Sequence, residues 1–236
     1  MKPLVSNISI RPSGGDSRKI ARSATRGELK VRDGQAPVFF QSVHEQNFLI
    51  ICRCDPNILR VRWEPFTLSY YDHREERKAS YTPDYLVDFV DGHGVDHMLV
   101  EVKTLRDYNR SRDDFAAKYR AAELWAEIQP SMSFKVATDR WMKDVGLENF
   151  RLLDSVRNRS LEADHLEVVR KEIINDKGLT LERIFERAIN CGVPKGLVMP
   201  VVLKLAQQGK VGFDVRKPLT METTFDDRPL TQAFRQ

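Results

Sequence analysis

The sequence has few features of a secreted or membrane protein. Its 236 residues include only three cysteines, Cys52, Cys54 and Cys191, and an odd number cannot form a fully paired disulfide framework. Cys52-x-Cys54 has no matching second pair, which argues against a zinc site. No run of about 18 apolar residues predicts a transmembrane helix, and the first residues lack the apolar segment of a signal peptide. We therefore expect reduced thiols, no membrane contact and a cytoplasmic location.

Charge of one sign is not in large excess, because 38 Lys and Arg stand against 34 Asp and Glu, a net charge of +4. The excess gathers near the N-terminus, where the first 40 residues hold eight basic and three acidic side chains. We interpret residues 1–38 as a basic, largely extended arm, with a flexible stretch at 12–17. Such an arm suits contact with a polyanion, but a solvated tail without a ligand explains it equally well.

Residues 39–155 combine helical and strand patterns. A helix is predicted over 42–53, with Val43, Phe48, Leu49 and Cys52 as its buried positions, and a second helix over 110–128. A strand–helix–strand connection of this kind predicts that the strand after the second helix runs parallel to the strand before it. The pattern favours an α/β domain with a mixed sheet flanked by helices. Its predicted strands are 58–63, 66–71, 85–90, 97–102 and 134–138, and a charged turn is predicted at 72–79.

Residues 156–236 form the predicted second domain, which is smaller and mainly helical. Helical periods cover 161–176, 180–191 and 195–208, and glycines separate them. Strand candidates follow at 211–215 and 221–225. Three helices followed by a β-ribbon is the order of a winged helix, so we expect a winged-helix-like C-terminal domain.

The most informative motif is Tyr81-Thr82-Pro83-Asp84, followed by Val100-Glu101-Val102-Lys103. The two segments border strands that a turn at 91–94 joins. If the hairpin folds about 93–94, Asp84 lies opposite Lys103. Glu101 and Lys103 leave the same face of their strand because they are two residues apart. Pro-Asp, a spacer and Glu-x-Lys on an apolar strand is the signature of the PD-(D/E)xK nucleases, although Glu-x-Lys alone also fits an edge-strand ion pair.

These side chains suit metal-assisted hydrolysis of a phosphodiester. Mg²⁺, with Mn²⁺ as a substitute, prefers carboxylate and carbonyl oxygens. Asp84 and Glu101 are the predicted ligands, and the backbone carbonyl of Val102 is a further one. Lys103 is predicted to orient the attacking water, lower its pKa or stabilise developing charge.

Glu45 is a third carboxylate with two possible roles. Ser42-x-x-Glu45 is a capping box for the helix at 42–53, and the residues alone favour that structural role over catalysis. Weaker candidates are Asp88 and Glu64, for which a surface charge and a structural role are the favoured explanations, and His44. A basic run after the Glu-x-Lys strand suits phosphate contacts or a solvated helix face; it comprises Arg106, Arg110, Arg112, Lys118 and Arg120.

Three blocks of the sequence resemble TnsA, the endonuclease subunit of heteromeric cut-and-paste transposases. They are Ser42 to Leu49 continuing through Cys54-Asp55-Pro56 to Trp63-Glu64-Pro65, then Tyr81 to Tyr85, then Val100 to Lys103. The resemblance implies that Glu45, Asp84 and Lys103 are catalytic, and that Glu45, Asp84, Glu101 and Val102 surround the metal. Some members of the family carry Gln where this chain has Glu101, so the site here would hold one more negative charge.

The resemblance also implies a function and partners. A chain of this family would be bacterial and would cut the 5′ ends of a transposon in a Mg²⁺-dependent reaction. Its partners would be DNA, a TnsB-like DDE transposase that cuts the 3′ ends, and a TnsC-like AAA+ ATPase that contacts the C-terminal domain. Two alternatives remain open at this stage: a stand-alone restriction or repair nuclease, and a non-catalytic assembly module with a nuclease fold.

Overall fold

The computed structural model describes residues 4–12, 25–91, 94–110, 112–228 and 230, with only the backbone at positions 112 and 114. The chain forms two compact units. The first contains residues 1–52 and 57–142, and the second contains residues 53–56 and 143–236. The second unit thus begins before residue 156, where the predicted second domain starts. No helix among the described residues is both long and apolar enough for a membrane span.

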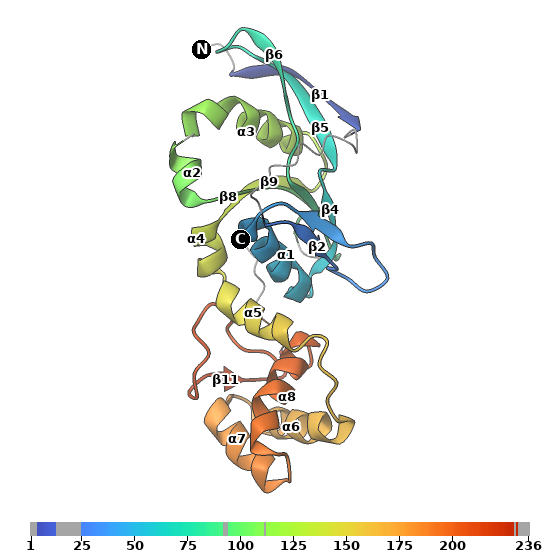
Figure 1. Cartoon of the computed structure of the whole chain (residues 1–236), viewed down its shortest axis with the longest axis vertical. Helices are drawn as coiled ribbons and strands as arrows, with labels where there is room; N and C mark the ends of the chain where they lie inside the picture. The colour runs from blue at the N-terminus through green and yellow to red at the C-terminus, as the bar shows by residue number, and fades with distance from the viewer. Residues whose placement is uncertain (1–3, 13–24, 92–93, 111, 229, 231–236) are drawn as a thin grey trace. The chain divides into compact units, whose positions relative to one another are not determined.

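A four-stranded mixed sheet forms the centre of the first unit (Figure 1). Its strands stand in the order β4 (Ile58–Trp63), β7 (Tyr85–Phe89), β8 (His97–Lys103) and β9 (Met132–Thr138). β7 is antiparallel to both β4 and β8, whereas β8 and β9 are parallel. The predicted α/β class, the mixed sheet and the parallel pairing are therefore confirmed. Every residue of β7 is buried, as expected for a central strand covered on both faces.

Helices α1 (Val43–Cys54) and α3 (Arg112–Glu127) cover opposite faces of this sheet. Phe48 of α1 stacks on Tyr85, with ring centroids 5.4 Å apart. Tyr85 pairs with Val100 on β8, so the next residue, Glu101, points to the other face, where α3 contacts it. The predicted burial of Val43 is wrong, since 47% of this residue is exposed. It stands at the first turn of α1, ahead of the positions that reach the core.

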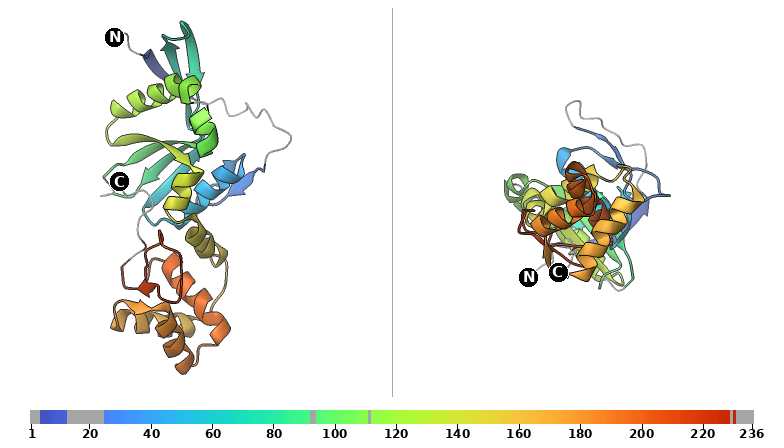
Figure 2. Two further views of the ribbon diagram at one scale, coloured as in Figure 1. Left: turned by 90° about the vertical axis from the view of Figure 1, so that its left-hand side faces the viewer. Right: turned by 90° about the horizontal axis from the view of Figure 1, so that it is seen from below.

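A second sheet was missed in part by the sequence reasoning. It has three antiparallel strands in the order β1 (Val5–Pro12), β5 (Phe66–Asp72) and β6 (Arg77–Tyr81). The predicted turn at 72–79 is too long, because β6 already begins at Arg77. Figures 1 and 2 show α3 between this sheet and the mixed sheet. The core under the three strands comprises Val5, Leu68, Tyr70, Tyr81, Ala117, Ala121 and Ala122.

The described parts of the predicted N-terminal arm are built into the first unit. Val5 is buried where β1 pairs with β5. β2 (Gly27–Leu29) and β3 (Val38–Phe40) form an antiparallel pair, and Leu29, Val31 and Val38 are buried. The stretch predicted to be flexible lies outside the described residues, apart from Pro12. Two short helices complete this part of the chain, α2 (Leu105–Arg110) and α4 (Asp139–Asp144).

The second unit contains the three predicted helices, as α6 (Ala163–Asn175), α7 (Leu181–Asn190) and α8 (Lys195–Gln207), preceded by α5 (Leu147–Ser155). β10 (Leu179–Thr180) pairs with β11 (Thr224–Phe225), and Gly212 forms an isolated bridge with Asp226. The strand predicted at 211–215 is thus reduced to one bridge, and that at 221–225 to two residues. Gly146, at φ 98°, must remain glycine because a Cβ would meet the Val215 carbonyl oxygen at 1.9 Å.

Candidate active site

The hairpin of β7 and β8 brings the Pro-Asp and Glu-x-Lys motifs together. Its register pairs Tyr85 with Val100 and Leu86 with Leu99, which places Asp84 beside Glu101. The predicted position of Asp84 opposite Lys103 is therefore wrong by two residues. The turn centre lies earlier than we assumed, and Gly92 and His93 fall outside the described residues. An error of two residues in the register keeps every side chain on its predicted face. Asp84, Glu101 and Lys103 therefore still lie close together, as predicted.

Glu101 is the most enclosed acidic group of the cluster, with 2% of its surface exposed. One carboxylate oxygen lies 3.1 Å from Nζ of Lys103 and 2.9 Å from Nζ of Lys118. The other accepts a 2.7 Å hydrogen bond from the hydroxyl of Tyr81. A buried carboxylate needs such partners because its transfer out of water is costly. Glu101 is thus a fixed anion, held by two ammonium groups and a phenol.

Asp84 is constrained by the backbone and by its acidic neighbours. Its Oδ2 accepts a 2.7 Å hydrogen bond from the backbone amide of Val102. Burial and the neighbouring Glu101 carboxylate, with a smaller contribution from Glu45, raise the pKa of Asp84 to about 8. The Lys103 ammonium and the Val102 amide oppose that rise. An ionised Asp84 would add to the negative charge of Glu101 and Glu45 beside the two lysines, and a bound cation would favour that ionised form.

Lys103 carries a positive charge in this environment. Burial acts to lower the pKa of its ammonium group, but the carboxylates of Glu101, Asp84 and Glu45 outweigh burial and raise that pKa above its usual value. A lysine with a raised pKa does not act as a general base near neutral pH. Of the three roles predicted for Lys103, the geometry therefore favours orientation of water and stabilisation of negative charge.

Ser42 caps α1 as predicted, but the Glu45 carboxylate accepts from the Ser42 hydroxyl and the Gln41 amide in place of the Ser42 amide of a full capping box. The backbone amide of Glu45 donates to Oγ of Ser42 at 3.1 Å, and that hydroxyl donates to one carboxylate oxygen of Glu45 at 2.9 Å. The other oxygen accepts from the amide of Gln41 and from the hydroxyl of Tyr85. Glu45 is nevertheless close enough to act on the pKa values of Asp84 and Lys103. The same side chain thus supports the start of the helix and borders the acidic cluster, and its catalytic role stays a prediction.

Glu64 lies at the rim of the cluster. Its amide donates a 2.9 Å hydrogen bond to the carbonyl oxygen of Asp84, and its backbone has a φ of 39°, which is rare for a residue with a Cβ. Burial, followed by the charge of Glu45, raises the pKa of Glu64. A strained residue at a cluster of acids is typical of functional sites, so Glu64 borders the site as well as linking β4 to β5.

The donor set suits a divalent ion of the magnesium type. No three His, Cys, Asp or Glu side chains within the described ranges are arranged around a common metal position. Mg²⁺ does not require three, because it usually keeps several waters and takes one or two carboxylates from the protein. Asp84 and Glu101 form such a pair, and a dication would favour the ionised form of Asp84 that burial and the Glu101 carboxylate disfavour. Oxygen donors of this kind also fit Mn²⁺.

Residues 55–139 match the family described as the TnsA-like endonuclease N-terminal domain. This part of the chain is TnsA-like. A comparison with curated proteins found no match. The matched segment contains Asp84, Glu101 and Lys103, whereas Glu45 precedes it. The resemblance drawn from the motifs is therefore confirmed for the TnsA-like domain.

Other predicted site residues lie away from this TnsA-like cluster. Asp88 is neither a surface charge nor a neighbour of Asp84, because it is 3% exposed and bonded to Arg60, Arg62 and His97. The hydrogen bonds from these partners outweigh burial and lower the pKa of Asp88. Asp88 therefore belongs to a buried ion network farther along β7. In the basic run, Arg120 pairs with Glu123 and Glu127, so it offers no free cation to a phosphate.

Lys118 is the site residue that sequence reasoning assigned incorrectly. We predicted it as one of several phosphate contacts on a helix face. In the TnsA-like domain it bonds Glu101 and lies over the rings of Phe115, Tyr81 and Tyr119, at 4.1, 4.8 and 4.9 Å from their centroids. Ring faces stabilise a partly buried ammonium. Lys118 is thus a positioning residue for Glu101, and only the fold places it there.

Lys118→Met should destabilise the protein because it removes one of the two cations beside a buried carboxylate. We expect a loss of about 2 kcal/mol in the free energy of unfolding. The same substitution in a Glu101→Gln background should cost much less, since the buried charge is gone. Urea denaturation of the wild type, both single variants and the double variant measures this coupling. An equal loss of unfolding free energy in both backgrounds would mean that Lys118 does not stabilise the Glu101 carboxylate.

Proposed function

We propose that the chain is a Mg²⁺-dependent DNA endonuclease subunit of a heteromeric transposase, which hydrolyses the phosphodiester at the 5′ ends of a mobile element. The observation that carries the proposal is the cluster of Asp84, Glu101 and Lys103 at one end of the β7–β8 hairpin, within a TnsA-like domain. Acid pairs with an adjacent lysine are suited to charge stabilisation during phosphoryl transfer.

The residues of this cluster divide the chemistry between them. Mg²⁺, when bound, supplies a hydroxide near neutral pH and stabilises negative charge as a Lewis acid. Asp84 and Glu101 would hold it, with the Val102 carbonyl as a further donor. Lys103 provides a fixed positive charge beside the transferred phosphoryl group. Tyr81 and Lys118 keep Glu101 in place, since they bond its two carboxylate oxygens separately.

The partners in this proposal are transposon-end DNA, a TnsB-like DDE transposase and a TnsC-like AAA+ ATPase. The second unit would provide the contact with the ATPase. We also propose that this unit is a winged-helix-like domain. The arrangement of α6, α7 and α8 with the β10–β11 pair and the Gly212–Asp226 bridge supports that assignment, because it joins a three-helix core to short antiparallel pairs.

Cleavage of labelled transposon-end DNA in the presence and absence of these partners tests the proposal. With Mg²⁺ and both partners, we expect 5′-strand cuts at the element's ends; with Mg²⁺ alone, we expect little cutting. Strong cutting of plain DNA by the purified chain would instead favour a stand-alone nuclease. Excision complexes that assemble with no 5′ cut, even with Mn²⁺, would favour a non-catalytic assembly module.

A further inference from the structure

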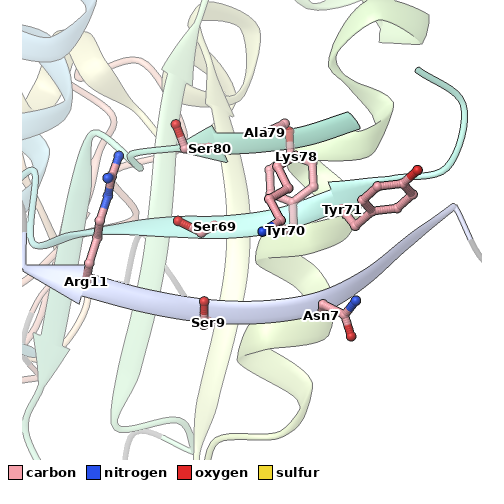
Figure 3. A pocket seen from close by; sticks show the side chains of 9 residues that line it. All are labelled: Asn7, Ser9, Arg11, Ser69, Tyr70, Tyr71, Lys78, Ala79 and Ser80. Carbon is pink, nitrogen blue, oxygen red and sulfur yellow. The ribbon is translucent and has the colours of Figure 1, made fainter. Parts of the chain in front are cut away.

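The sheet of β1, β5 and β6 has a polar face turned away from α3. A shallow hollow of about 510 Å³ lies on it, and Figure 3 shows the side chains that line this hollow. Ser9, Ser69 and Ser80 form one row across the three strands, because the register pairs Ser69 with each of the other two. Side chains of alternate residues point the other way and build the core on α3. The hollow is lined by Asn7, Ser9, Arg11, Ser69, Tyr70, Tyr71, Lys78, Ala79 and Ser80.

The lining of this face has cations and hydroxyl groups but no carboxylate. Arg11 stands at one end of the hollow and Lys78 toward the other, with the serine row between them (Figure 3). Both cations are exposed, and neither pairs with an acidic side chain of the residues that the structure describes. Among the described residues, the hollow thus contains two cations and no acidic side chain, which gives it a positive charge.

The spacing of these groups matches an extended polyanion better than a small one. Arg11 pairs with Thr67 and Lys78 pairs with Tyr71 across the central strand. Thr67 and Tyr71 are four residues apart, so the two cations stand about 13 Å from each other along the strand direction. A single phosphate ion could contact both only if the two long side chains bent toward each other. Successive phosphates of a nucleic acid can contact them separately, and serine hydroxyls and an asparagine amide are common partners of phosphate oxygens.

The face also lies close to the acidic cluster along the chain. β6 continues through Thr82 and Pro83 directly into Asp84, and Thr82 bonds Thr67 at 2.7 Å on the way. Ser80 is four residues before Asp84, so their Cα atoms are at most about 14 Å apart. This distance corresponds to about four nucleotide steps at about 3.4 Å each. A short segment of chain therefore joins the face to the cluster, although Ser80 points away from α3 and Glu101 points toward it.

We propose that this face binds the sugar–phosphate backbone of the DNA duplex beside the position that is cut. Arg11 and Lys78 contact separate phosphates, and the row of Ser9, Ser69 and Ser80 donates hydrogen bonds between them. The contacts are to the backbone, so the face positions the duplex without reading its sequence. This inference rests on the proposed function and adds a surface that sets where DNA lies relative to Asp84.

Salt-dependent binding of a fluorescein-labelled 30-base-pair duplex of arbitrary sequence tests the inference. Anisotropy is measured in EDTA from 50 to 300 mM NaCl, so that no cleavage occurs. Each lost phosphate contact should reduce the slope of log K against log salt by about 1. We expect a reduction of about 1 for Arg11→Gln or Lys78→Gln and of about 2 for the double variant. Ser80→Asp, which adds a carboxylate to the face, should weaken binding at low salt.

Arg77→Gln is the matched control, because Arg77 adjoins Lys78 on β6 but does not line the hollow. It removes the same charge and should leave the slope close to that of the wild type. Circular dichroism and thermal melts show whether each variant is folded. An unchanged slope in the folded double variant, or an equal reduction in Arg77→Gln, would overturn the inference.

The inference and the proposed function fail in different ways. Asp84→Ala should bind the duplex as the wild type does and yet fail to cut. If the face variants bind normally while the wild type cuts DNA, only the inference is lost. If the wild type never cuts but the face variants lose salt dependence, only the nuclease proposal is lost.

Discussion

Asp84→Ala and Lys103→Ala should each reduce 5′-strand cleavage by about 10³-fold or more, while the protein stays folded. Asp84 is one of the two carboxylates available to a divalent ion, and Lys103 is the cation beside them. Loss of Asp84 would weaken the binding of the metal ion, and loss of Lys103 would leave developing negative charge without a nearby cation. Single-turnover cleavage of a labelled transposon end, with the partner proteins present, measures the effect.

Asp91→Ala is a suitable control for this comparison. Asp91 is an exposed carboxylate in the turn of the same hairpin, so its loss should leave the rate within about twofold of the wild type, as expected for a surface change. Full cleavage by Asp84→Ala with the same partners would show that the acidic cluster is not the catalytic site.

Glu45→Gln separates the two roles of Glu45. The amide keeps a carbonyl oxygen for the Gln41 amide but removes the charge. If Glu45 only caps α1, cleavage should remain near the wild-type rate with a small loss of stability. If its charge serves the cluster, as the TnsA resemblance implies, cleavage should fall by about 10²-fold with the helix retained. Far-ultraviolet circular dichroism together with the cleavage rate distinguishes these results.

Metal-free protein should lose stability as the pH rises from about 4 to about 8. The native state raises the pKa of Asp84 to about 8, whereas its usual value is 3.8. Native Asp84 therefore keeps a proton over this range that the unfolded chain releases. Stability is greatest below the unfolded pKa and declines until the native pKa is passed, with a slope of up to about 1.4 kcal/mol per pH unit.

Urea denaturation in EDTA at pH 5, 6, 7 and 8 measures this slope. Asp84→Asn should remove most of it, and at pH 8 this variant should be more stable than the wild type. Mg²⁺ should stabilise the wild type at pH 8 but not the variant, because bound cation favours the ionised carboxylate. Parallel pH curves for the two proteins would contradict the claim that the native fold raises the pKa of Asp84.

The sequence predicted the β7–β8 hairpin because its signals are local. An apolar strand, a glycine turn and a second apolar strand fix the pairing partners, and residues two apart must share a face. The exact register depends on the turn, and our error of two residues shows how weakly Asp91-Gly92-His93-Gly94 defines its centre. The faces were correct because the error was even. Helices α6 to α8 were predictable for a similar reason, since glycines separate their periods.

The remaining features depend on tertiary contacts that no local pattern encodes. β6 begins with Arg77 and Lys78, which resemble a charged turn, and it becomes a strand only because β5 pairs with it. Lys118 lies seventeen residues beyond Glu101 on a helix with other basic residues, so nothing in its surroundings distinguishes it. Asp88 resembles a surface charge until β4 and β8 bring Arg60, Arg62 and His97 to it.

The central claim is that Asp84 and Glu101, with Lys103 beside them, hold one divalent ion at the end of the β7–β8 hairpin. Anomalous scattering from a crystal soaked in Mn²⁺ tests it directly. The account predicts a manganese peak in contact with the carboxylates of both Asp84 and Glu101, which disappears in Asp84→Ala crystals. A peak bound elsewhere, or none between these two side chains at millimolar Mn²⁺, would contradict it.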